Sequence, residues 1–148
     1  MTARGPAFGS SGRGCYGGYG DAWDEAVEQA RVTLYRWAAE GKPRTYTDLA
    51  REVTAIPWPE DAFTHSGQQI GMLLGQVSLN ELVRDEDRPV LSSIVVGGDE
   101  HVPTRGYWTF VRTELGIPVP RSDLGQLEHW QAEFAAACAY YGPKATSA

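Results

Sequence analysis

Apolar residues recur every three or four positions along residues 21–40, which is the spacing of a helix with one buried face. The apolar stripe consists of Trp23, Val27, Ala30, Leu34, Trp37 and Ala38. Charged residues such as Glu25 and Arg36 fall outside it. Asp21 can cap the start of this helix and Gly41 can end it. The pattern predicts a core-facing helix and needs no functional explanation.

Residues 45–111 predict two short helices followed by two strands. Thr47 is a plausible N-cap for the first helix. Ser66 is a good N-cap for the second, and Gln69 follows three residues later, as in a capping box. The apolar face of this second helix consists of Ile70, Leu73, Leu74 and Val77.

Two segments after these helices have strand-like sequences. Residues 90–96 and 107–111 are rich in β-branched and aromatic side chains. The Gly-rich loop between them closes at Arg105-Gly106. We expect the two segments to pair antiparallel and to form the wing of a winged helix.

A last helix is expected from Ser122 or Asp123 to about Tyr141, with Gly142-Pro143 as its stop signal. Its apolar positions are Leu124, Leu127, Trp130 or Gln131, Phe134 and Cys138. The predicted fold class is therefore α+β, with a winged-helix-like core flanked by a long N-terminal and a long C-terminal helix. The expected organisation is a flexible Gly-rich tail over 1–20, one domain over 21–142, and a flexible tail over 143–148.

The net charge of −6 limits the possible partners of the chain. An acidic protein repels a phosphate backbone unless its few cations cluster, so the charge leaves room for a protein partner. No apolar run reaches about 18 residues, and no basic-then-apolar signal segment begins the chain. We therefore expect a cytoplasmic protein with no membrane partner. Cys15 and Cys138 lie far apart and indicate no disulfide framework.

The Gly-rich N-terminal segment allows two further interpretations besides a flexible tail. Arg13, Tyr16 and Tyr19 could stack on the bases of a single strand. Arg13 could also favour the thiolate form of Cys15, although no histidine or helix start is evident beside that cysteine.

No group of residues with the spacing of a catalytic or metal site emerges. The histidines are scattered, and His129 with Glu133 forms a helix-face pair of a kind that solvated helices often carry. Ser92 and Ser93 lack a Gly-x-Ser-x-Gly elbow. We expect no catalytic residue, no metal and no cofactor.

Four short segments resemble the DNA-binding half of the alkylguanine-DNA alkyltransferases and their alkyltransferase-like relatives. Residues 45–50 resemble that family's Thr-Tyr-Gly-x-Leu-Ala opening, and residues 68–74 resemble its Arg-Ala-Val-Gly-x-Ala-Leu recognition helix. Residues 91–96 fall where the family has Pro-Cys-His-Arg-Val-Val, and Gly106-Tyr107 falls at its Gly-Tyr. The layout is also similar to that of small uncharacterised bacterial and phage proteins.

The departures from this family concern its reactive positions. Ser92 stands at the position of the nucleophilic cysteine and Ser93 at the position of the neighbouring histidine. Gln68 stands at the position of the arginine that replaces the extruded base. A serine hydroxyl without a base is not ionised at neutral pH, so we expect no alkyl transfer from O6-alkylguanine.

The favoured prediction is a non-catalytic winged-helix module that binds duplex DNA weakly or within a larger complex. Glutamines of the second helix can read base edges, and arginines can meet phosphate. The predicted DNA-binding residues are Thr47, Arg51, Gln68, Gln69, Gln76 and Arg105. The alternative is an acidic protein-interaction module that regulates a partner protein, in a phage or bacterial defence context. An enzyme comes third.

Overall fold

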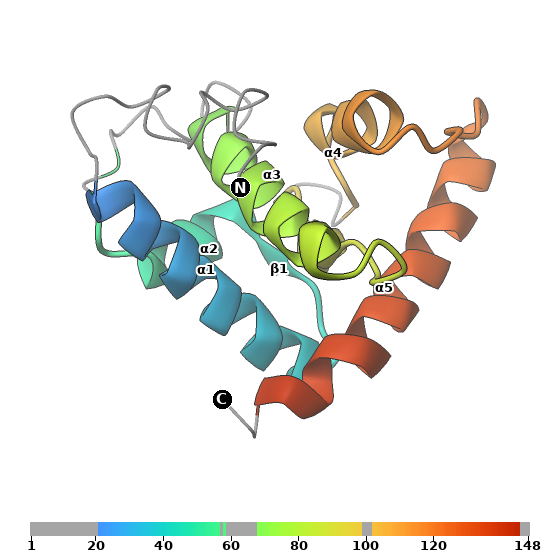
Figure 1. The fold of residues 1–148 in the computed structure, drawn as a ribbon. Coiled ribbons are helices and arrows are strands. Elements are labelled where there is room, and N and C mark those ends of the chain that lie inside the picture. Colours follow the sequence, from blue (N-terminus) through green and yellow to red (C-terminus); the bar gives the residue numbers. More distant parts are fainter. Residues whose placement is uncertain (1–20, 57, 59–67, 99–101, 146–148) are drawn as a thin grey trace.

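The computed structural model describes residues 21–56, 58, 68–98 and 102–145 (Figure 1). The elements, in chain order, are α1 (Asp21–Glu40), β1 (Arg44–Thr45), α2 (Tyr46–Glu52), α3 (Gln68–Arg84), the 3-10 helix η3 (Leu91–Ile94), β2 (Val95–Val96), α4 (Arg105–Thr109), the π-helical turn η4 (Phe110–Glu114) and α5 (Asp123–Ala145). The predictions for residues 1–20 with Cys15, for Ser66 as a cap, and for the loop tip at residues 99–101 lie outside the described residues.

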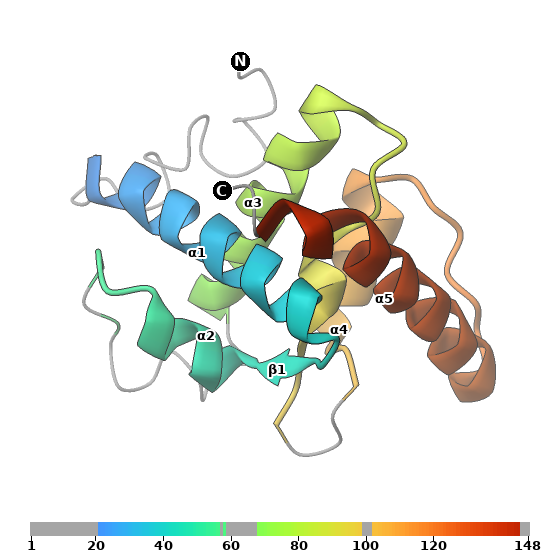
Figure 2. The ribbon, with the colours of Figure 1, turned by 90° about the horizontal axis from the view of Figure 1, so that it is seen from below.

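Helix α1 packs against α3 and against the C-terminal half of α5 (Figures 1 and 2). Its predicted stripe is confirmed, since Trp23, Ala30 and Leu34 are fully buried. The helix ends where predicted, because Gly41 has a φ of 72° and its N–H bonds to the Trp37 carbonyl at 3.0 Å.

Helix α2 begins two residues earlier than the sequence indicated. The N-cap is Thr45 and not Thr47: the Thr45 hydroxyl accepts from the Asp48 N–H at 3.2 Å, and the Asp48 carboxylate accepts from the Thr45 N–H at 3.3 Å. This reciprocal pair satisfies two free N–H groups, whereas a cap at Thr47 would satisfy one.

Helix α3 carries the predicted buried face, with Ile70 and Leu73 fully buried and Leu74 and Val77 almost so. Its apolar face packs into the larger of two groups of buried side chains, together with α1, η3 and the C-terminal part of α5.

The predicted antiparallel wing is wrong. Val95–Val96 pairs instead with Arg44–Thr45 in a two-residue parallel sheet, with Arg44 opposite Val95 and Thr45 opposite Val96. Residues 91–94 form a 3-10 helix, and residues 105–114 are helical. The α+β class still holds in its coarse form, as a mostly helical chain with this small sheet.

Burial explains why residues 107–111 are helical in spite of their strand-like composition. Tyr107, Phe110 and Val111 are buried, and positions i, i+3 and i+4 share one face of a helix. They pack with Leu79 and Trp130 in the second group of buried side chains. Tertiary packing has therefore overridden the local preference of these residues for a strand.

Helix α5 continues through Gly142 and Pro143 to Ala145, so the predicted stop is wrong and residues 143–145 of the predicted tail are helical. Residues 146–148 of that tail lie outside the described residues. Gly142 is buried where the two long helices meet: a Cβ at this position would lie 3.3 Å from the Ala38 carbonyl oxygen and from the Ala39 Cα. Packing on α1 therefore stabilises the last turn despite the N–H that Pro143 lacks.

Four tyrosines predict how the fold responds to alkali. Burial raises the pKa of Tyr46, Tyr107 and Tyr141, and it raises the pKa of Tyr35 together with the hydrogen bond to Glu81. A phenol whose pKa is higher in the folded than in the unfolded protein stabilises the fold. This stabilisation is fully present below the unfolded pKa of about 10 and is lost as the pH rises through the folded pKa. We expect the thermal midpoint to fall steeply above about pH 10, with phenolate absorbance appearing together with loss of circular dichroism.

Tyr107→Phe is the matched variant for this test, because the Tyr107 hydroxyl is buried and has no hydrogen-bond partner among the described residues. The variant should be at least as stable as the wild type at neutral pH and should lose less stability in alkali. If the phenolate absorbance of all four tyrosines appeared while the helical signal stayed unchanged, this expectation would be wrong.

Candidate functional site

The surface predicted to meet DNA is built from α2, the start of α3 and the start of α4. Thr47 lies half-buried on α2, and Arg51 is 74% exposed with its Nη1 3.5 Å from Asp48 Oδ1. Arg105 is exposed at the first position of α4. The hydroxyl groups of Tyr46 and Thr104 are hydrogen-bonded at 2.7 Å, which holds the first turn of α2 against the residue before Arg105.

Three glutamines of α3 were predicted to read bases, and the structure describes the side chain of one of them, Gln76. The side chains of Gln68 and Gln69 lie outside the described part of the chain, and the backbone places them in the first turn of the helix. Gln76 is partly buried, and its Nε2 donates to Asn80 Oδ1 at 2.9 Å. Its Oε1 is buried without a hydrogen-bond partner among the described residues, so Gln76 can read a base edge only if the side chain turns outward.

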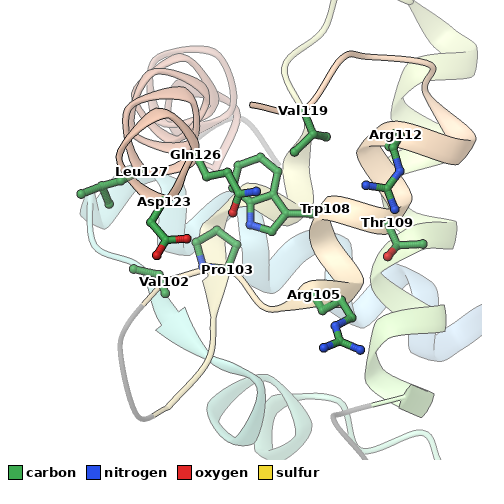
Figure 3. A pocket seen from close by; sticks show the side chains of 10 residues that line it. All are labelled: Val102, Pro103, Arg105, Trp108, Thr109, Arg112, Val119, Asp123, Gln126 and Leu127. Carbon is green, nitrogen blue, oxygen red and sulfur yellow. The ribbon is translucent and has the colours of Figure 1, made fainter. Parts of the chain in front are cut away.

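An open hollow of about 910 Å³ lies between α4, η4 and the N-terminal half of α5 (Figure 3). Its walls are formed by Val102, Pro103, Arg105, Trp108, Thr109, Arg112, Val119, Asp123, Gln126 and Leu127. Arg105, Trp108 and Arg112 follow one side of the α4–η4 helix at positions i, i+3 and i+7. Asp123, Gln126 and Leu127 form the facing wall on α5.

The Trp108 ring is held in place by other aromatic rings. Its centroid lies 5.0 Å from that of Tyr107 at an interplanar angle of 80°, and 5.8 Å from that of His129 at 60°. Both contacts are edge-to-face arrangements, which aromatic pairs prefer. Trp108 therefore forms a fixed, half-buried wall of the hollow.

The arginines near the hollow differ from most of the other arginines in the described chain. Ion pairs with carboxylates hold those on α1, β1 and α2, such as Arg36 with Glu52 at 2.9 Å. Arg105, Arg112 and Arg121 form no ion pair with any described residue. Residues 102–127 carry these three arginines and two carboxylates, a net charge of +1 in a chain of −6.

A buried polar network joins α1, α3 and the loop before η3. Glu81 is fully buried, accepts a hydrogen bond from the Tyr35 hydroxyl at 2.7 Å, and forms a short ion pair with Arg88. The Tyr35 ring stacks on Tyr141 of α5 at 5.4 Å, and the Arg88 guanidinium lies over the Tyr140 ring at 5.4 Å. With its carboxylate enclosed, this network serves the fold.

Sequence reasoning missed Glu81, although a signal was present. Glu81 lies four residues after Val77 and thus extends the apolar face of α3. An acidic residue at an otherwise buried helical position predicts a buried partner.

The two serines that stand at the reactive alkyltransferase positions have no base beside them among the described residues. The Ser93 hydroxyl donates to the Val90 carbonyl at 2.7 Å, and the Ser92 N–H donates to Ser78 Oγ at 3.0 Å. Among the described residues, no histidine or carboxylate is hydrogen-bonded to either hydroxyl. This geometry gives neither serine the activation that a nucleophile needs.

The described residues contain no group of three or more histidines, cysteines or carboxylates placed to hold a metal ion. Glu133, which the sequence pairs with His129, accepts instead from the Val90 N–H at 2.7 Å. None of the described helices has an apolar stretch long enough to cross a membrane.

Of the predicted DNA-binding residues, the structure brings the helix of Thr47 and Arg51 close to Arg105. It also adds Trp108, which the sequence placed within the second predicted strand, and Arg112, to which the sequence gave no role. Comparison of the chain with known protein families, with curated proteins and with solved structures finds no match.

Proposed function

We propose that the chain is a non-catalytic, cytoplasmic module that contacts duplex DNA weakly or within a larger complex. The observation that carries this proposal is the position of Arg105. It is exposed, it forms no ion pair with a described residue, and the Tyr46–Thr104 hydrogen bond holds the preceding residue against α2. An arginine free of carboxylates can meet a phosphate without first breaking an ion pair.

We include in this proposal a relationship to the DNA-binding half of the alkyltransferases. The proposed relationship covers helices α2 and α3 and does not include a hairpin wing. Two segments that carry the sequence resemblance lie side by side, since Thr45 pairs with Val96 in the parallel sheet. The third, at the start of α3, packs its apolar face into the same core. This arrangement supports a shared scaffold in which the first turn of α3 enters the major groove.

Two double variants test the proposal by fluorescence anisotropy with random and defined duplexes at several salt concentrations. Arg51→Ala with Arg105→Ala should weaken binding to all sequences and lower the slope of log K against log salt by about 2. Gln68→Ala with Gln69→Ala should leave thermal stability nearly unchanged. It should reduce the free-energy difference between binding to the preferred and to other base sequences, by about 1–3 kcal/mol for each bidentate contact to adenine.

Arg84→Ala is the matched control, because this exposed arginine lies at the opposite end of α3 from Gln68. It should bind duplex as the wild type does. The groove-binding proposal fails if both double variants also bind like the wild type at low salt.

A protein-docking function is the second candidate, and an exposed apolar face favours it. Leu124 is 66% exposed and Leu127 is 36% exposed on the N-terminal half of α5, at two of the apolar positions that the sequence places at helical spacing. The described residues that pack on α5 at this level leave this side of the helix uncovered. Apolar side chains left exposed together on one face of a helix often mark a contact with another protein. If duplex binding fails as described above, this candidate takes its place.

A further inference from the structure

We propose that the hollow between α4 and α5 binds a nucleotide, with its phosphate held by Arg105 and Arg112 and its base stacked on Trp108. This inference goes beyond the proposed duplex contact, because a paired and stacked base cannot enter the hollow.

The anion-binding part rests on the two arginines. Arg105 and Arg112 both line the hollow, are exposed and form no ion pair with a described residue. They lie seven positions apart, about 10 Å along a helix axis, and their long side chains can close on a group between them. A guanidinium offers a planar set of donors that matches phosphate oxygens.

The base-binding part rests on Trp108. Figure 3 shows its ring projecting into the space between the arginines and the α5 wall, with Pro103 beneath it. Because the edge contacts with Tyr107 and His129 hold the ring, a base can stack on it with little further ordering. Stacking on an aromatic ring accepts every base, so the site should show little base preference.

The facing wall limits the ligand further. Asp123 contributes a carboxylate that can accept hydrogen bonds from ribose hydroxyl groups or from base amino groups, and that repels additional phosphates. Two arginines against one carboxylate favour a nucleoside monophosphate over a triphosphate. The volume of about 910 Å³ lies within the range of small-molecule sites.

Isothermal titration calorimetry with the full chain tests the site, using a nucleoside monophosphate, the corresponding nucleoside, inorganic phosphate and a single-stranded hexanucleotide. We expect the monophosphate to bind at least tenfold more tightly than either the nucleoside or inorganic phosphate. Equal affinity for the nucleoside would overturn the role of the arginines, and equal affinity for inorganic phosphate would overturn the role of Trp108. Absence of binding to all four probes would overturn the site.

The hexanucleotide shows whether the bound nucleotide is free or belongs to a single strand. Tighter binding of the hexanucleotide than of the monophosphate assigns the site to a nucleotide within a single strand. Tighter binding of the monophosphate assigns it to a free nucleotide. Duplex binding is measured separately on the same wild-type protein. Failure of the protein to bind a nucleotide therefore leaves the duplex proposal standing, and failure to bind duplex leaves the nucleotide site standing.

Arg112→Gln is the deciding variant, since Arg112 is exposed and its replacement should leave the thermal midpoint unchanged. It should weaken monophosphate binding at least tenfold, whereas the exposed control Arg84→Gln should not. Asp123→Asn should reduce the ratio of monophosphate affinity to triphosphate affinity, because it removes the carboxylate that repels additional phosphates. Unchanged monophosphate affinity in folded Arg112→Gln protein would contradict the proposal.

Discussion

Replacing Glu81 with leucine is expected to lower the free energy of unfolding by about 3–5 kcal/mol. The Glu81 carboxylate is fully buried, and it is the partner of both the Tyr35 hydroxyl and the Arg88 guanidinium. The variant would leave the Arg88 charge largely enclosed, because only 17% of that side chain is exposed. An uncompensated charge away from water costs more than the lost bond itself.

A double-mutant cycle measured by urea unfolding separates these contributions. Arg88→Leu alone should also be strongly destabilising, because it leaves the Glu81 carboxylate with Tyr35 alone. The double variant Glu81→Leu with Arg88→Leu should recover part of the loss, since neither charge is then left behind. Glu86→Gln, at an exposed acid a few residues on, is the control and should change stability by less than about 0.5 kcal/mol. A Glu81→Leu protein as stable as this control would show that the ion pair does not stabilise the fold.

Ile70→Asp is expected to unfold the domain, with a loss of more than about 4 kcal/mol. Ile70 is fully buried on the face of α3 that packs into the larger core. None of the described side chains of that core carries a charge that could pair with an added carboxylate. Burial raises the pKa of such a carboxylate, so the cost should be smaller at low pH, where it is protonated, and should reach its full size as the pH rises.

Circular dichroism melting from about pH 4 to pH 8 measures this effect. Asn80→Asp introduces the same carboxylate at an exposed position of α3 and should melt close to the wild type. Ile70→Val keeps the position apolar and should cost about 0.5–1.5 kcal/mol. A folded Ile70→Asp protein with a normal midpoint would mean that this face of α3 is not buried in solution.

The helices whose apolar stripe is long were predicted well. The spacing of Trp23, Ala30 and Leu34 was sufficient to predict α1, and that of Ile70 and Leu73 was sufficient to predict α3. A helix that buries one face must repeat its apolar residues with the helical period. The second helix was also found, with its cap displaced from Thr45. Its two threonines lie two positions apart, and the reciprocal bond of Asp48 decides between them.

The wing failed because β-branched and aromatic residues occur both in strands and in buried helices. Residues 91–96 are buried throughout, and a short run of apolar residues has no period that distinguishes the two states. Two residues of this run do form a strand, but their partner is Arg44–Thr45, which lies too far along the chain for any local pattern to show.

The candidate site was only partly predictable for the same reason. Arg105 was predicted to meet phosphate from the end of the loop before the second strand. With residues 107–111 taken as a strand, Trp108 and Arg112 had no reason to share a side with Arg105, and the helical spacing that joins all three became visible only in the structure. The α5 wall of the hollow also depends on tertiary packing, since Asp123 and Leu127 approach Trp108 only after the connector turns back.

The packing of α1 against α5 has a consequence for how the protein is made. The first described helix is covered by the last, with Tyr35 stacked on Tyr141 and Gly142 seated against Ala38. While the ribosome is still extending the chain, the apolar face of α1 has no such cover, and native pairing of the two helices must wait until α5 has emerged. Contacts between distant parts of a chain form slowly. The fold therefore cannot be completed before α5 has been made, and until then the part of α1 that α5 covers is an exposed apolar surface on which partly made chains can associate.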